Sequence, residues 1–167
     1  MAALDPKDII NSICILRLSA IGDVTHMVPI IHSLQKFSPK TKITWVIGTT
    51  EFKLLEGLPN VEFIQFNKKL GLKAYIDIRQ QLKNRHFDIL LACQVSLRAN
   101  ILATLISAKR KIGYDKARAK DLHGLVINER IPPANVHVLD SFFQFVEQIG
   151  ISHKSLDWNI PIPEEDQ

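Results

Sequence analysis

Apolar runs of strand length alternate with longer stretches in which apolar residues recur at helical spacing. A continuous apolar run with one arginine, of the kind found in buried parallel strands, covers residues 13–18. Further strands are predicted over 42–48, 61–66 and 87–93, and a shorter strand is expected over 109–115. Helices are predicted from Val24 onward and over residues 49–58, 70–84, 97–108 and 136–150. This alternation predicts an α/β fold, a Rossmann-like open parallel sheet with right-handed crossovers and helices on both faces.

Three local signals refine the predicted helices. Pro29 falls near the first turn of the first helix, where its missing N–H group is tolerated. Thr49 is expected to cap the helix over 49–58. Gly150 is expected to end the helix over 136–150, because glycine is the usual residue just past a helix C-terminus.

The composition is that of an ordinary globular protein. The chain has 167 residues, of which 46% are hydrophobic and 23% charged, so it is long enough for one domain or one half of a two-domain enzyme. Its formal net charge of +4 suits an anionic ligand or a membrane surface, although a solvated basic surface explains the charge equally well. We expect no nucleic-acid partner.

Cys14 and Cys93 both fall in apolar strands, which predicts buried free thiols in a reducing compartment. Their spacing fits neither a disulfide framework nor a metal site, and we expect no metal and no cofactor. The polar start of the chain does not resemble a signal peptide, and no apolar run approaches the roughly 18–20 residues of a membrane span. A cytoplasmic protein is therefore expected.

The loop after the first strand is the first candidate for a ligand site, because ligands of open α/β sheets bind beyond the carboxyl ends of the strands. It reads Leu-Ser-Ala-Ile-Gly-Asp over residues 18–23. A dinucleotide site would have a G-x-G-x-x-G loop, whereas Gly22 is the single glycine here, and a Walker A loop is absent too. The carboxylate of Asp23 would also repel a phosphate, so phosphate binding at this turn is disfavoured.

Asp23 has two interpretations. It can cap the helix that it begins, where the helix dipole favours a negative charge. It can also act as a general base that accepts a proton from an attacking hydroxyl, since its position faces the ligand crevice. The helix N-terminus favours the ionised carboxylate and so weakens it as a base, which leaves both interpretations open at this point.

Three segments carry a family resemblance. The first, RLSAIGDVTHMVPII (17–31), has a basic residue, small residues, Gly-Asp and an early helical proline. The second, FDILLACQVSLRANILATLISAKRKIGYDKARAKD (87–121), has a strand, a Gln-containing loop, a basic residue in a helix and an IG-aromatic-D…AR segment. The third, ANVHVLDSFFQFVEQIG (134–150), is a helix led by a histidine. Over about residues 12–150 the chain resembles glycosyltransferase family 9, the lipopolysaccharide heptosyltransferases and their relatives.

The resemblance implies a GT-B architecture in which two Rossmann-like domains face a cleft. Residues 1–155 would form the N-terminal, acceptor-side domain, and residues 156–167 would begin the interdomain linker. The C-terminal domain that binds the nucleotide-sugar donor would be absent from this chain, so the chain alone should not catalyse transfer. We therefore expect the N-terminal half of a heptosyltransferase-like enzyme.

The family is inverting and metal-independent, and typically moves heptose from ADP-heptose to the Kdo-containing inner core of lipopolysaccharide. Asp23 would be the general base. The implied partners are the nucleotide-sugar donor, a glycolipid acceptor and the anionic surface of the inner membrane, at whose cytoplasmic face the intact protein would work. The basic stretch over 109–120 is a candidate for lipid contact, and a solvated loop explains it almost as well.

The acceptor would be bound by a set of polar residues from the matching segments: Arg17, Ser19, Gly22, Gln94, Arg98 and Arg118. A guanidinium group suits a Kdo carboxylate or a phosphate. Each arginine also has a structural alternative, because Arg17 can pair with Asp23, Arg98 can be a solvated first-turn residue and Arg118 can be a solvated loop residue. His137 is expected to cap its helix. Val95 departs from the family, which has glycine after the glutamine.

Two other functions compete with this one. The chain can be a stand-alone nucleotide-binding or regulatory α/β module, against which the missing glycine-rich loop argues. It can also be an interaction domain in which Asp23 does no more than cap a helix.

Overall fold

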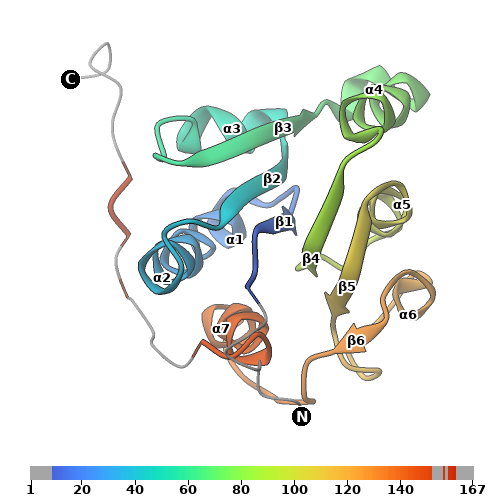
Figure 1. Ribbon diagram of the computed structural model, residues 1–167. Helices are drawn as coiled ribbons and strands as arrows, with labels where there is room; N and C mark the ends of the chain where they lie inside the picture. Colours follow the sequence, from blue (N-terminus) through green and yellow to red (C-terminus); the bar gives the residue numbers. More distant parts are fainter. Residues whose placement is uncertain (1–8, 152–155, 157, 161–167) are drawn as a thin grey trace.

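The structure is a computed structural model that describes residues 9–151, 156 and 158–160. It contains one six-stranded sheet in the order β3-β2-β1-β4-β5-β6, and every pair of neighbouring strands is parallel. This is the strand order of a Rossmann fold, with the change of direction between β1 and β4. The predicted fold class is confirmed (Figure 1).

The strands are β1 (Ser12–Leu16), β2 (Lys42–Gly48), β3 (Val61–Phe66), β4 (His86–Ala92), β5 (Ser107–Gly113) and β6 (Glu129–Arg130). The helices are α1 (Ile21–Thr25), α2 (Val28–Phe37), α3 (Thr49–Leu55), α4 (Leu72–Leu82), α5 (Leu97–Leu105), α6 (His123–Val126) and α7 (Val138–Gln148), with a 3₁₀ turn η1 (Lys68–Leu70). No helix in the described part of the chain is both long and apolar enough to cross a bilayer.

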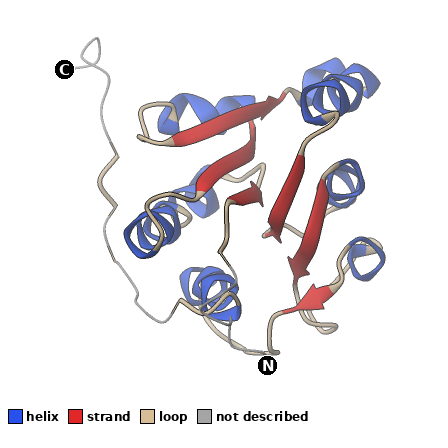
Figure 2. Ribbon diagram, in the orientation of Figure 1, coloured by secondary structure: helices blue, strands red, loops and turns tan. Residues whose placement is uncertain are grey.

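The sheet is covered on both faces (Figure 2). Alternate residues of β1 point to opposite faces, so Ile13 and Ile15 join one core cluster and Cys14 and Leu16 the other. The first cluster is closed by α1, α2, α3 and α7, with Trp45 as its largest buried side chain. The second cluster is closed by α4 and α5. Burial on both faces explains why these strands have continuous apolar sequences.

The helix predicted from Val24 is two helices. A turn at His26 and Met27 separates α1 from α2, and Pro29 lies in the first turn of α2, where no N–H donor is needed. The predicted Thr49 cap is wrong. The N-cap of α3 is Gly48, and the Thr49 hydroxyl is buried without a partner among the described residues.

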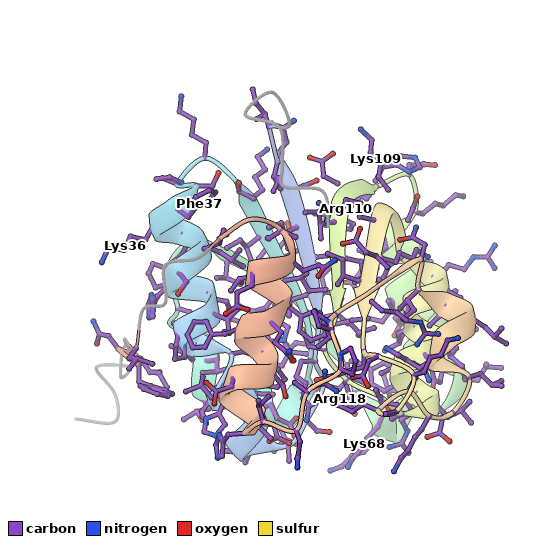
Figure 3. All side chains as sticks on the ribbon, turned by 90° about the horizontal axis from the view of Figure 1, so that it is seen from below. Lys36, Phe37, Lys68, Lys109, Arg110 and Arg118 are labelled. Atoms are coloured by element: carbon purple, nitrogen blue, oxygen red, sulfur yellow. The ribbon has the colours of Figure 1, made fainter. Side chains whose placement is uncertain are left out.

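Residues 109–120 do not form one basic loop. Most of the first half is strand β5, where Arg110 pairs with Glu129 at 2.6 Å and Lys111 donates to the carbonyl oxygen of Ala103 at 3.0 Å. Figure 3 shows Lys109 and Arg110 at the opposite end of the molecule from Arg118. The short elements β6 and α6 were not predicted, because two and four residues are too few for a periodic pattern.

The ends of α7 agree with the sequence. Nδ1 of His137 accepts a hydrogen bond from the Leu139 amide at 3.4 Å, so the expected helix cap is confirmed. Gly150 has a φ of +94°, and the Ile151 amide donates back to the Val146 carbonyl at 3.0 Å.

Cys14 and Cys93 are buried free thiols, as predicted. Burial raises the pKa of Cys14 to about 12 and raises the pKa of Cys93 well above its ordinary value. Both thiols therefore remain protonated and unreactive at neutral pH.

Candidate active site

A cavity of about 520 Å³ lies at the carboxyl edge of the sheet. It is formed by the loops that follow β1, β2, β3 and β4. Its lining includes three of the predicted site residues, Ser19, Gln94 and Arg98. Arg17, Gly22, Asp23 and Arg118 lie outside the lining. The site therefore has two parts, an arginine–aspartate ion pair after β1 and a polar cavity beside it.

Arg17 and Asp23 form the ion pair. Nη2 of Arg17 donates to Oδ2 of Asp23 at 2.7 Å, and Nη1 donates to the carbonyl oxygen of Cys93 at 2.7 Å. The guanidinium group also lies 5.5 Å from the ring centre of Phe142. The Arg17 side chain is 14% exposed and that of Asp23 is 37% exposed, so the arginine is mostly buried and the carboxylate reaches solvent.

The contacts of Asp23 bear on both of its interpretations. Its side chain makes no hydrogen bond to an amide of α1, whose N-cap is Ala20, so Asp23 is not the N-cap residue, although it lies in the first turn of α1, where the helix dipole favours its charge. Oδ2 is occupied by Arg17, whereas Oδ1 accepts no hydrogen bond from the described residues. One oxygen is thus held in place and the other is open to a ligand, which is an arrangement that suits a general base.

The Cys93 carbonyl connects the pair to β5. It also accepts a hydrogen bond from the hydroxyl of Tyr114 at 3.0 Å, so Arg17 and Tyr114 both donate to the same Cys93 carbonyl oxygen. Burial raises the pKa of Tyr114 far above its ordinary value, which keeps the phenol protonated and donating. The three groups form a rigid support behind Asp23.

Gln94 shapes the wall of the cavity and does not point a free amide into it. Its Oε1 accepts from the Leu18 amide at 2.8 Å and from the Ser19 amide at 3.2 Å. Its Nε2 donates to the hydroxyl of Ser96 at 3.3 Å. The side chain therefore joins the loop after β1 to the loop after β4. Val95, which stands where the family has glycine, packs against the apolar core.

Exposed cations line the cavity from two sides. Arg98 is in the first turn of α5, and Lys68 and Lys69 come from η1. None of the three forms an ion pair with any residue that the structure describes, while Glu51 is the acidic side chain of the lining. Sequence reasoning missed both lysines. Their signal was the run NKK directly after the strand over 61–66, at the strand end where ligands bind.

Arg118 is held inside the protein's own hydrogen-bond network. Nε donates to the carboxylate of Asp115, Nη1 donates to Ser141 at 3.0 Å, and Nη2 donates to the Pro132 carbonyl at 3.0 Å and to Gln144 at 3.1 Å. Its guanidinium lies 5.2 Å from the ring centre of Tyr114. The solvated alternative is therefore wrong, and the side chain ties the loop after β5 to α7.

His123 fixes the same loop from the other side. Its Nε2 accepts from the Tyr114 amide at 3.0 Å, which places the proton on Nδ1, within 2.9 Å of the Asn100 side-chain oxygen. Burial, followed by the charge of Arg130, lowers the pKa of His123 to about 4. The imidazole is therefore neutral in the folded protein at neutral pH.

This shift predicts a pH dependence of stability. Between the ordinary histidine pKa of about 6.5 and the folded value, the unfolded chain binds a proton that the folded chain does not, so stability falls as the pH falls. We expect about 3 kcal/mol of unfolding free energy to be lost between pH 7 and pH 4 through this group. Urea unfolding of His123→Gln should lack this component, and His86→Gln, which removes an exposed histidine, should retain it. Equal pH profiles of the wild type and His123→Gln would contradict the assignment.

The model of glycosyltransferase family 9 (heptosyltransferase) matches residues 75–167. The chain belongs to this family. Over 157 residues it is 42% identical to the lipopolysaccharide core heptosyltransferase OpsX of Haemophilus influenzae, covering 93% of this chain and 45% of the relative. The resemblance seen in the sequence is thereby confirmed.

Solved structures agree with the fold. A family 9 glycosyltransferase of Veillonella parvula superposes with a TM-score of 0.77 at 24% identity, over 93% of this chain and 46% of that one. The E. coli heptosyltransferase WaaC with ADP superposes with a TM-score of 0.74 at 21% identity, over 89% of this chain and 51% of that one. This family 9 chain spans about half the length of the relatives that it matches.

Proposed function

We propose that the intact enzyme is an inverting, metal-independent heptosyltransferase that moves heptose from ADP-heptose to the inner core of lipopolysaccharide. This chain would be its acceptor-binding half. The observation that carries the proposal is the Asp23 carboxylate, held on one oxygen by Arg17 and open on the other, beside a cavity lined by cations that pair with no described residue.

In the proposed reaction, Oδ1 of Asp23 accepts the proton of the acceptor hydroxyl while the hydroxyl oxygen attacks the anomeric carbon of the heptose. The bond from that carbon to the oxygen of the ADP phosphate breaks, and ADP leaves with the electron pair. Attack from the face opposite the leaving group inverts the anomeric configuration. Arg17 serves the step by fixing the orientation of the carboxylate.

The cavity supports an anionic acceptor. Lys68, Lys69 and Arg98 offer ammonium and guanidinium donors to carboxylates or phosphates of a Kdo-containing core. The donor would bind to a second domain that follows the linker over 156–167, with residues 1–155 as the acceptor domain. Since the acceptor is a glycolipid, we propose that the enzyme works as a peripheral protein at the cytoplasmic face of the inner membrane.

Replacing both lysines of the cavity should weaken acceptor binding selectively. In the full-length enzyme, Lys68→Ala together with Lys69→Ala should raise the KM for the acceptor about 30-fold and leave the KM for ADP-heptose unchanged, because each lost charged contact costs on the order of 1 kcal/mol. Steady-state kinetics measures both constants. Lys36→Ala with Lys40→Ala, two exposed lysines outside the cavity lining, is the matched control. A raised KM for ADP-heptose alone would assign the cavity to the donor.

The function itself is tested by incubating the full-length enzyme with ADP-heptose and a Kdo-bearing acceptor, both with and without excess EDTA. Transfer with inversion, read from the anomeric coupling in the NMR spectrum of the product, is the expected result. Transfer with retention, or transfer that EDTA abolishes, would contradict the mechanism, and no transfer at all would contradict the function.

A further inference from the structure

Exposed leucines gather where three helices begin. Leu72, the first residue of α4, is 75% exposed, and Leu97, the first residue of α5, is 56% exposed. Leu122, the N-cap residue of α6, is 67% exposed, and Leu125, inside α6, is 81% exposed. Single exposed leucines are ordinary, but a group at one edge of a protein marks an interaction surface.

These helices are neighbours, so the leucines form one surface. α5 contacts both α4 and α6. The Asn100 side chain of α5 donates to the carbonyl oxygens of Lys120 at 3.2 Å and Asp121 at 2.7 Å, which fixes the start of α6 against α5. We define the leucine rim as Leu70, Leu72, Leu97, Leu122 and Leu125, all of them exposed.

The leucine rim is interleaved with cations. In the sequence, Lys69 precedes Leu70, Lys73 follows Leu72, Arg98 follows Leu97, and Lys120 stands two residues before Leu122. With Lys68 and Lys116 these make six exposed cations, and none of them forms an ion pair with a described residue. Asp121 is the exposed acidic residue among them. The surface therefore has a strong positive excess.

The rim also adjoins the cavity. Leu97 and Arg98 contribute to the cavity lining, and Lys68 and Lys69 line it from the neighbouring turn. A surface that received the leucine rim would therefore lie at the mouth of the acceptor site.

We propose that the leucine rim docks on an anionic lipid bilayer. The leucine side chains enter the boundary between headgroups and acyl chains, and the interleaved lysines contact lipid phosphates at the level of the headgroups. Neither the leucine insertion nor the lysine–phosphate contacts suffice alone, and together they give reversible binding to the bilayer. The proposal rests on the proposed function, which makes the enzyme a peripheral membrane protein, and deepens it by assigning the surface that contacts the lipid. Docked this way, the cavity opens at the height where a glycolipid presents its sugars.

The test is co-sedimentation of this chain and of the full-length enzyme with vesicles of pure phosphatidylcholine or with about 30% phosphatidylglycerol, an anionic fraction that gives the bilayer a negative surface potential. Both proteins should bind the anionic vesicles and not the neutral ones. Leu72→Ser with Leu125→Ser should lower binding at least about tenfold, and Lys73→Glu with Lys120→Glu should lower it about as much. None of these four residues lines the cavity. Phe37→Ser, which removes a 55% exposed apolar side chain at the opposite end, should bind like the wild type (Figure 3).

Three results would overturn the proposal. The first is unchanged vesicle binding by the leucine pair. The second is concentration-dependent dimerisation of the full-length enzyme that the leucine pair abolishes, which would assign the rim to a second copy. The third is binding by this chain but not by the full-length enzyme, which would show that the rest of the enzyme covers the rim. The vesicles contain no acceptor, and transfer to a delipidated acceptor is measured separately, so this outcome is independent of the transferase assignment.

Discussion

Replacing Asp23 with asparagine in the full-length enzyme should lower kcat by about 10²- to 10⁴-fold, the usual contribution of a general base. The amide oxygen of the introduced asparagine can still accept the Arg17 hydrogen bond, which in the wild type measures 2.7 Å, so the local geometry is retained. The amide cannot take up a proton from the acceptor hydroxyl. Steady-state kinetics with saturating donor and acceptor measures the loss.

The same variant separates catalysis from structure. The Arg17–Asp23 pair is partly exposed on the Asp23 side, so its loss should change the unfolding free energy by no more than about 1 kcal/mol. Asp140→Asn is the matched control, because Asp140 is also an aspartate in the first turn of a helix and is exposed. If Asp23→Asn lowers the unfolding free energy but leaves kcat unchanged, Asp23 has a structural role and is not the general base.

Replacing Arg118 with methionine should destabilise the chain by about 2–4 kcal/mol, since it leaves the buried carboxylate of Asp115 without its partner. The Asp115 side chain is 6% exposed, and Ser141 and Gln144 would also lose the hydrogen bonds that Arg118 donates, while the Pro132 carbonyl would keep the bond from the Gln144 amide. The expected loss starts at about 2 kcal/mol because the Arg118 side chain is 24% exposed and water weakens its ion pair. Urea unfolding at pH 7 measures the difference, with Arg79→Met on the exposed face of α4 as the neutral control.

The pH dependence of the unfolding free energy gives a second test of the Arg118–Asp115 pair. Burial alone would raise the pKa of Asp115, but the hydrogen bond and the charge of Arg118 hold it below the ordinary value. The ionised carboxylate therefore contributes stability that is present above the ordinary aspartate pKa of about 4 and is lost as the pH falls through the folded value. Arg118→Met should lack that acid-induced loss. Normal stability combined with a raised acceptor KM would instead make Arg118 an acceptor ligand.

Periodicity predicted the elements that pack on both sides of the sheet. Strands such as β1 and β2 are buried on two faces, so their apolar character is continuous, and α7 has a clear apolar face that ends at Gly150. The elements that escaped prediction are β6 and α6, which are short. They are held by side chains far apart in sequence, such as Asn100 and His123, which no local pattern reveals.

The candidate site was predictable where the residues lie on a motif. Asp23, Arg17 and Gln94 all lie at the carboxyl edge, and the pairing of Arg17 with Asp23 was one of the stated alternatives. Which atoms remain open was not predictable. Gln94 uses its amide oxygen on two backbone amides, and Arg118 uses its donors on α7 and the loop before it, because these partners depend on the packing of distant segments.

The most direct test of the account is an NMR titration of this 167-residue chain with a Kdo-bearing acceptor and, separately, with ADP and ADP-heptose. We expect saturable amide shifts from the acceptor at Ser19, Asp23, Lys68 and Arg98, with no response to either nucleotide. Tight, saturable binding of ADP at residues 18–23 with no response to the acceptor would contradict it and would make the chain a nucleotide-binding module.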